Sequence, residues 1–161
     1  MTDERLGDGL WSAIARLPRG GGVVFRHYAT PTTERRRLFV RVVRVARTRG
    51  LVVIRAGSWC GFGADGVHNQ RGRGLRTASA HSLTEARVAV RRGADAVFVS
   101  PVFTTRSHPG AEVLGVKQAK RIARALGVPA IALGGMDAVR FRGMWGFYGW
   151  AAIDAWNSDA K

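Results

Sequence analysis

Cysteine is nearly absent from this chain of 161 residues, which contains only Cys60. One cysteine excludes an internal disulfide and a cysteine-rich metal site, and it fits the reducing conditions of the cytoplasm. No apolar run approaches the roughly 20 residues that a membrane-spanning helix needs. Residues 1–9 are polar, so no signal peptide is visible. We therefore expect a cytoplasmic protein that has no membrane partner.

Acidic residues are also scarce, with 11 of them against 26 basic ones and a formal net charge of +15. All of the basic residues except Lys117, Lys120 and Lys161 are arginines. Such a charge attracts polyanions. However, the arginines between residues 35 and 49 share a predicted helix with an apolar face, which is the ordinary pattern of a solvated amphipathic helix. The sequence contains no recognised DNA- or RNA-binding motif, so nucleic acid ranks last among the expected partners.

Short apolar runs alternate with helical periods along the chain, which at 46% hydrophobic residues is able to bury the core of one domain, residues 1–161. We predict strands at 23–25, 51–54, 66–68, 76–80, 96–99, 129–133 and 147–150. We predict helices at 10–17, from a cap at Thr32 or Thr33 to Gly50, from a capping box at 82–85 to Gly93, and at 116–126. This alternation indicates parallel strands that are buried on both faces.

The predicted strands number one fewer than the eight of a closed (β/α)8 barrel. The helix at 10–17 precedes the first visible strand, although a helix in an alternating fold normally follows one. We therefore predict an α/β fold of the TIM (β/α)8-barrel type, truncated and lacking its first strand, which would lie before Met1. An open barrel exposes strand edges that invite pairing with another chain, so we expect a homodimer.

Small residues follow the last two predicted strands. Leu133 leads into Gly134-Gly135, and Trp150 leads into Ala151-Ala152. In a barrel of this type, the loops after the last two strands often hold a phosphate, and glycine lets an oxyanion come close to backbone N–H groups. We therefore predict that Gly134, Gly135, Ala151 and Ala152 bind a small phosphorylated ligand. The alternative is a plain turn after each strand.

Six short motifs recur in the order and spacing of one known family. They are GADGVH at 63–68, SAHS with EA at 79–86, GAD with PVFTT at 93–105, LG at 114–115, PAIALGGM at 129–136 and WAAI at 150–153. In these motifs the chain resembles the thiamine-phosphate synthase family, including its TenI-like thiazole tautomerase branch. The TDER of residues 2–5 resembles the TDxR that follows the first strand of that family, in agreement with the strand count.

The resemblance implies a TIM barrel of thiamine biosynthesis, a transferase that joins a pyrimidine pyrophosphate to a thiazole phosphate. In that family Mg²⁺ holds the pyrophosphate as it leaves. The resemblance also implies substrate- or phosphate-binding roles for Ser79, Thr105 and Ser107. The catalytic candidates are His81, Arg26 and His108, and a structural histidine is an equal alternative for His81.

The chain departs from the family at the magnesium site. The family's NDD is replaced by Arg55-Ala56-Gly57, residues 69–72 contain no carboxylate, and Tyr28 stands in place of a lysine. Ser100-Pro101 also replaces the glycine–histidine pair of the tautomerase branch. We therefore expect a diverged member that binds thiazole phosphate, with the family reaction, a TenI-like tautomerase and a non-catalytic regulatory module left open, and we predict no metal ligands.

Overall fold

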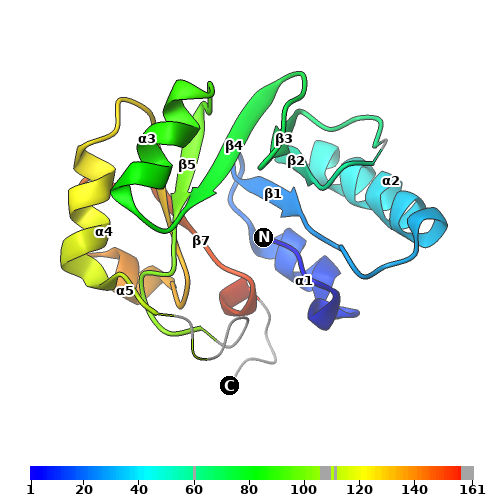
Figure 1. The fold of residues 1–161 in the computed structure, drawn as a ribbon. Helices are drawn as coiled ribbons and strands as arrows, with labels where there is room; N and C mark the ends of the chain where they lie inside the picture. Colours follow the sequence, from blue (N-terminus) through cyan, green and yellow to red (C-terminus); the bar gives the residue numbers. More distant parts are fainter. Residues whose placement is uncertain (60, 106–109, 111, 157–161) are drawn as a thin grey trace. The chain divides into compact units, whose positions relative to one another are not determined.

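The structure is a computed structural model, and it describes residues 1–59, 61–105, 110 and 112–156. The chain divides into two compact units, which we describe separately: Met1–Leu75 with the chain end from Ile153, and Arg76–Ala152. Figure 1 shows the elements of both units. Among the described residues, no helix is both long enough and apolar enough to cross a membrane. The single barrel domain over residues 1–161 stays a prediction.

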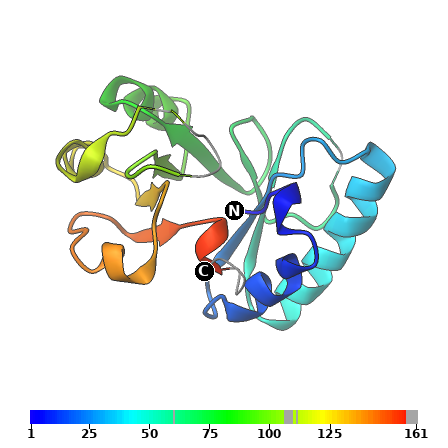
Figure 2. The same ribbon diagram turned by 90° about the horizontal axis from the view of Figure 1, so that it is seen from below.

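The first unit is built on three parallel strands that pair in chain order, with Gly22 opposite Val52 and Ile54 opposite Gly66. Its elements are η1 (Glu4–Leu6), α1 (Gly9–Arg16), β1 (Gly22–Phe25), α2 (Thr32–Thr48), β2 (Val52–Ala56), β3 (Gly66–His68) and η2 (Asp154–Trp156). In Figures 1 and 2, the long helix α2 runs beside β1 and β2. This arrangement places the carboxyl ends of the three strands at one edge.

The core of the first unit lies between its strands and α2. The buried face of α2 carries Phe39, Val42, Val43 and Ala46, at the spacing of one helical stripe. The ring of Phe39 meets Phe25 of β1 edge to face at 5.2 Å. Each side chain of this size contributes roughly 1.5–3 kcal/mol when it is fully buried. Most of the arginines of α2 lie on the exposed side, as the amphipathic pattern predicts.

The N-terminus of α2 differs from the prediction. Thr32 is already the first helical residue, and Pro31 occupies the N-cap position without a side-chain hydrogen bond. A cap at Thr32 or Thr33 is therefore wrong. Pro31 has φ −51° and ψ 143°, an entry that proline favours, and its carbonyl oxygen accepts from Arg35 N at 2.8 Å.

The second unit contains four parallel strands, again paired in chain order. Its elements are β4 (Leu75–Ala80, whose first residue belongs to the first unit), α3 (Leu83–Arg91), β5 (Ala96–Val99), α4 (Gly115–Arg124), β6 (Ala130–Leu133), α5 (Ala138–Phe141) and β7 (Gly149–Ala151). Val97 lies opposite Ala130, and Leu133 lies opposite Ala151. Buried side chains of β5, β6 and α4 form the core, including Val97, Val99 and Ile122.

The last strand begins later than predicted. The sequence pattern predicts a strand at 147–150, but β7 covers Gly149–Ala151. Phe147 is held in a turn, since its N–H donates to Met144 O at 3.3 Å. Its apolar side chain packs against the core of the second unit, so burial there does not require a strand.

The two GAD motifs start strands in the same way. Asp65, before β3, exchanges hydrogen bonds with Val53: its backbone N–H donates to Val53 O at 2.8 Å, and its carboxylate accepts from Val53 N at 2.7 Å. Asp95, before β5, makes the equivalent pair with Arg76, at 2.7 Å in both directions. These aspartates therefore set the register of neighbouring strands at the amino ends, away from the carboxyl edge.

Residue 2 lies beside β1. Thr2 N donates to Val24 O at 2.8 Å, and Thr2 Oγ1 accepts from Arg26 N at 3.0 Å. A strand preceding Met1 stays a prediction.

Candidate functional site

The carboxyl ends of β4, β5, β6 and β7 bring most of the predicted site residues to one edge of the second unit. The register pairs Ala80 with Val99, Val99 with Ala132, and Leu133 with Ala151. The residues that follow these strands are His81, Ser100, Gly134 and Ala152. Neighbouring strands lie about 4.8 Å apart. Gly134 and Ala151 are therefore close together, as predicted.

The turn at Gly134-Gly135 has no room for side chains. Both residues have positive φ, +93° and +59°. A Cβ on Gly134 would lie 2.7 Å from Pro101 Cα, and one on Gly135 would lie 2.4 Å from Thr104 O. The loop after β5 packs directly on this turn, since Phe103 N donates to Gly134 O at 3.1 Å. Glycine is required here both by conformation and by space.

The backbone donors of this turn are available. Within the part of the chain that the structure describes, neither Gly134 N nor Gly135 N donates to a backbone oxygen outside the strands. Gly134 is buried and Gly135 is partly buried. Because buried backbone N–H groups are nearly always paired, these two neighbouring donors suit an acceptor that comes from a ligand. An anionic oxygen makes the strongest hydrogen bonds with such donors.

Arg140 places a positive charge at the same turn. Its guanidinium donates to Gly135 O and lies 5.1 Å from the centre of the Phe103 ring. Its Nε also lies 3.6 Å from Asp137 Oδ2, and the Asp137 carboxylate caps α5. The sequence patterns considered above do not indicate Arg140 as a site residue. The available signal was an N-cap aspartate three residues before an arginine, directly after the glycine turn.

His81 is held in one orientation after β4. Its Nδ1 lies 2.7 Å from Ser100 O, and its backbone N–H donates to the Glu85 carboxylate at 2.9 Å. A carbonyl oxygen only accepts, so Nδ1 carries the proton. In the neutral ring, Nε2 therefore keeps its lone pair. The side chain is exposed, so this nitrogen is open to a ligand.

The other predicted residues fall into three groups. Ser79 lies in β4 opposite Phe98, and Thr105 lies in the loop that packs on the glycine turn. Ser107 and His108 lie outside the described residues. Arg26 lies after β1 in the first unit, where its guanidinium contacts Met1 Sδ at 3.7 Å. The catalytic role of Arg26 stays a prediction.

Two histidines of the first unit are structural. His27 stacks on the Phe25 ring at 4.5 Å, and its Nδ1 lies 3.0 Å from Thr2 Oγ1. Burial lowers the pKa of His27. His68 ends β3 and is 2% exposed. Burial, with the positive charge of Arg26 as a smaller cause, lowers the pKa of His68 to about 4.

The residues at the carboxyl end of β2 do not fit Mg²⁺. Arg55 donates to Gly57 O at 3.0 Å and to Trp59 O, so its guanidinium is tied to this loop. Ala56 beside it is buried and has no oxygen ligand in its side chain. Mg²⁺ requires oxygen ligands, usually from carboxylates, and a guanidinium repels it. Across the described residues, no three histidine, cysteine, aspartate or glutamate side chains are grouped to hold a metal ion.

Curated relatives match parts of the chain. A protein of Aquifex aeolicus, proposed as its second thiamine-phosphate synthase, is 40% identical over 77 residues, covering 47% of this chain and 41% of its own. A thiamine-phosphate synthase of Chloroflexus aurantiacus is 36% identical over 87 residues, covering 46% of this chain and 40% of its own. The matched region thus spans about two fifths of these relatives.

The fold is similar to that of a solved structure, thiamine phosphate pyrophosphorylase from Pyrococcus furiosus. The TM-score is 0.81 at 23% identity, with 99% of this chain and 87% of that chain covered. This likeness supports the α/β barrel-type fold with parallel strands. The family model described as thiamine monophosphate synthase (TMP-TENI) matches residues 3–155. The chain therefore belongs to the thiamine monophosphate synthase family.

Proposed function

We propose that the carboxyl edge of β4–β7 binds a small phosphorylated thiazole, or a related pyrimidine phosphate, in thiamine biosynthesis. The glycine turn is the observation that supports this most. Gly134 N and Gly135 N are available as donors, Arg140 lies beside them, and Ala151 adjoins them on the next strand. Backbone donors with a nearby guanidinium suit a phosphate.

The ligand reaches from this turn toward β4. Two strand spacings separate β6 from β4, roughly 10 Å. A phosphate at Gly134 and Gly135 therefore leaves space for a heterocycle over β5, with Ser79 and His81 at its far side. Ala152 and Thr105 lie next to the phosphate end and are proposed to contribute there.

The family reaction is the more demanding proposal. It joins the thiazole nitrogen to the methylene carbon of the pyrimidine and expels pyrophosphate. Arg55 and Ala56 do not fit the metal that assists this departure in the family, so we propose ligand binding without magnesium-dependent synthesis by this chain alone.

Calorimetry with thiazole phosphate tests the binding site. We compare the wild type with Ala151→Asp and Ala151→Asn, because these variants have side chains of the same shape and differ in charge. Successive side chains of a strand point to opposite faces. Because Trp150 packs against the core, the side chain of Ala151 lies on the other face of β7. We expect the aspartate to weaken binding at least tenfold more than the asparagine. No heat from the wild type at millimolar ligand, or equal effects of both variants, contradicts the site.

His81 favours a second candidate function, proton transfer on the ring of the bound ligand, as in the tautomerase branch. Its Nδ1 donates to Ser100 O, so Nε2 is set to take up a proton. Exchange of a ligand ring proton in D2O, followed by proton NMR, tests this role. We expect exchange with the wild type and at least a hundredfold slower exchange with His81→Asn at unchanged affinity. Equal rates in both proteins contradict it.

A further inference from the structure

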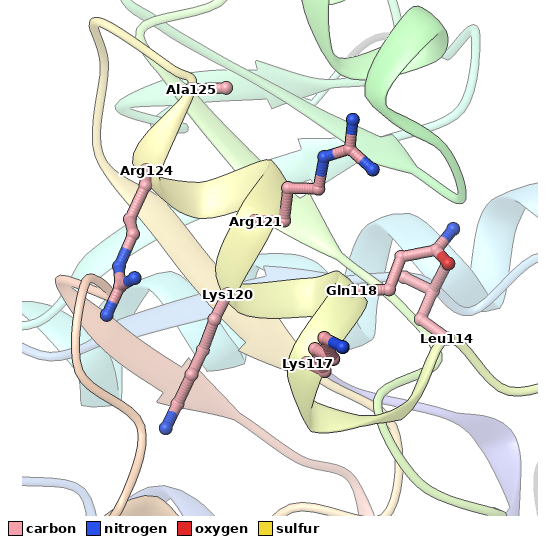
Figure 3. A pocket seen from close by; sticks show the side chains of 7 residues that line it. All are labelled: Leu114, Lys117, Gln118, Lys120, Arg121, Arg124 and Ala125. Atoms are coloured by element: carbon pink, nitrogen blue, oxygen red, sulfur yellow. The ribbon is translucent and has the colours of Figure 1, made fainter.

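The outer face of α4 carries four cations on one stripe. Lys117, Lys120, Arg121 and Arg124 have the i, i+3, i+4, i+7 spacing that places residues on one side of a helix. They line a hollow of about 730 Å³ together with Leu114, Gln118 and Ala125. Figure 3 shows these side chains projecting from the helix, with Arg124 and Lys120 to one side and Arg121 to the other. We call this surface the α4 cationic face.

Nothing acidic balances these charges within the described residues. No carboxylate lines the hollow, and none of the four cations is in an ion pair there. Like charges three or four residues apart destabilise a helix by a few tenths of a kcal/mol per pair. An anionic partner removes this cost.

The turn at residues 145–148, which contacts the last turn of α4, carries two exposed aromatic rings. Trp145 is 73% exposed and Tyr148 is 81% exposed, although both are large. The turn that carries them touches the last turn of α4, since a Cβ on Gly146 would lie 3.2 Å from Arg124 Cγ. Phe147 packs in the core and anchors the turn. The rings are therefore presented on a fixed backbone.

We propose that the α4 cationic face and the rings of Trp145 and Tyr148 bind single-stranded nucleic acid. Its phosphates lie along the four cations, which span about 10 Å of helix axis, and unpaired bases stack on the two rings. A positively charged track beside aromatic rings is the usual means of binding single strands without reading their sequence. This inference is independent of the phosphate site at Gly134 and Gly135.

A lipid surface fits these observations less well. Helices that bind membranes insert an apolar face, but the apolar residues of α4 are already buried in the core, with Ala119, Ile122 and Ala123 at most 4% exposed. Sequence motifs do not reveal this surface, because α4 and the turn at 145–148 are about twenty residues apart and the fold joins them.

Fluorescence polarisation with a labelled 20-residue oligouridine or oligothymidine tests the proposal on the full chain between 50 and 200 mM NaCl. The slope of log K against log salt is expected near −3, about −0.7 for each of four phosphates. We expect Lys120→Glu/Arg124→Glu and Trp145→Ala/Tyr148→Ala each to bind at least tenfold more weakly. The matched control is Arg37→Glu/Arg44→Glu on exposed positions of α2, with the same charge change and an expected loss under threefold.

Several results would overturn the proposal. An equal loss in the α2 control would indicate attraction by net charge alone. Unchanged binding without the two rings, or duplex binding as tight as single-strand binding, would contradict stacking of unpaired bases. Sedimentation with phosphatidylserine vesicles in the absence of oligonucleotide binding overturns it in favour of a membrane. Unchanged thermal unfolding of the variants shows that they are folded.

Discussion

At the scale of single residues, Arg140 both shapes the glycine turn and lies where the phosphate is proposed to bind. Its guanidinium holds the Gly135 carbonyl group and lies over Phe103, so it shapes the turn and also places a positive charge beside the two available N–H groups. A phosphate at the turn would be stabilised by that charge in addition to the backbone donors.

The Arg140→Ala variant is expected to bind thiazole phosphate roughly 10- to 100-fold more weakly, because a hydrogen bond to a charged group contributes about 1.5–3 kcal/mol. Arg140→Lys retains the charge but loses the planar guanidinium, so we expect an intermediate loss. Calorimetry measures the affinities, and urea unfolding measures any change in stability. Wild-type affinity in the alanine variant contradicts a phosphate at this turn.

His68 makes stability depend on pH. The ring is buried and neutral in the folded protein, with its pKa lowered from 6.5 to about 4. The unfolded chain therefore binds the proton more readily. The contribution of neutral His68 to the free energy of unfolding, about 3 kcal/mol, is fully present above pH 6.5 and is lost as the pH falls toward 4.

The test is urea unfolding of the wild type and His68→Gln at several values between pH 7.5 and pH 4. Glutamine keeps polar atoms at this position but does not titrate. We expect the stability of the wild type to fall more steeply than that of the variant between pH 6.5 and pH 4. Parallel pH profiles would show that His68 is protonated as easily in the folded protein as in the unfolded chain.

At the scale of elements, the start of α3 shows how a local motif and its surroundings combine. Ser82 Oγ accepts from Glu85 N at 3.1 Å, as the capping box predicts. The Glu85 carboxylate reaches back one residue further than predicted, to His81 N. The cap of α3 thus also orients the backbone of His81.

Ser82→Ala is expected to lower the free energy of unfolding by about 1 kcal/mol, because the hydroxyl satisfies a backbone N–H group at the helix start. Ser82→Thr keeps a capping hydroxyl and is expected to lose less than half as much. Urea unfolding compares the two. If the hydroxyl contributes nothing, both variants will unfold at the same urea concentration.

Element boundaries agree with the sequence where turn residues border an apolar run. β3 at Gly66–His68 and β5 at Ala96–Val99 begin and end as predicted, because an aspartate sets the start of each. The boundaries of β7 and α2 differ, since Phe147 packs against the core from a turn and Pro31 sets the helix entry without a side-chain cap. At Phe147, apolar character indicates packing against the core but not a strand.

At the scale of the whole molecule, the expected assembly is a homodimer. The barrel is predicted to be open between its first and last strands, here β1 (Gly22–Phe25) and β7 (Gly149–Ala151). Open strand edges favour pairing with a second copy.

Multi-angle light scattering at micromolar concentration is expected to give about twice the chain mass of 17.5 kDa. The measurement is made at 150 and 500 mM NaCl, because a charge of +15 repels a second copy at low salt. Dimer content is therefore expected to rise with salt. A monomer at both salt concentrations contradicts edge pairing.

The sequence alone determined the family, the alternation of strands and helices, and the small residues after the last two predicted strands, because each depends on local order or on short motifs. The tertiary structure alone decided which side chains meet. It placed the Arg140 guanidinium on the Gly135 carbonyl group, the His81 ring on Ser100 O, and Gly146, in the turn that carries Trp145 and Tyr148, against Arg124. These contacts join residues from different turns, strands and helices, and their distances follow from how the elements pack, which no local pattern specifies.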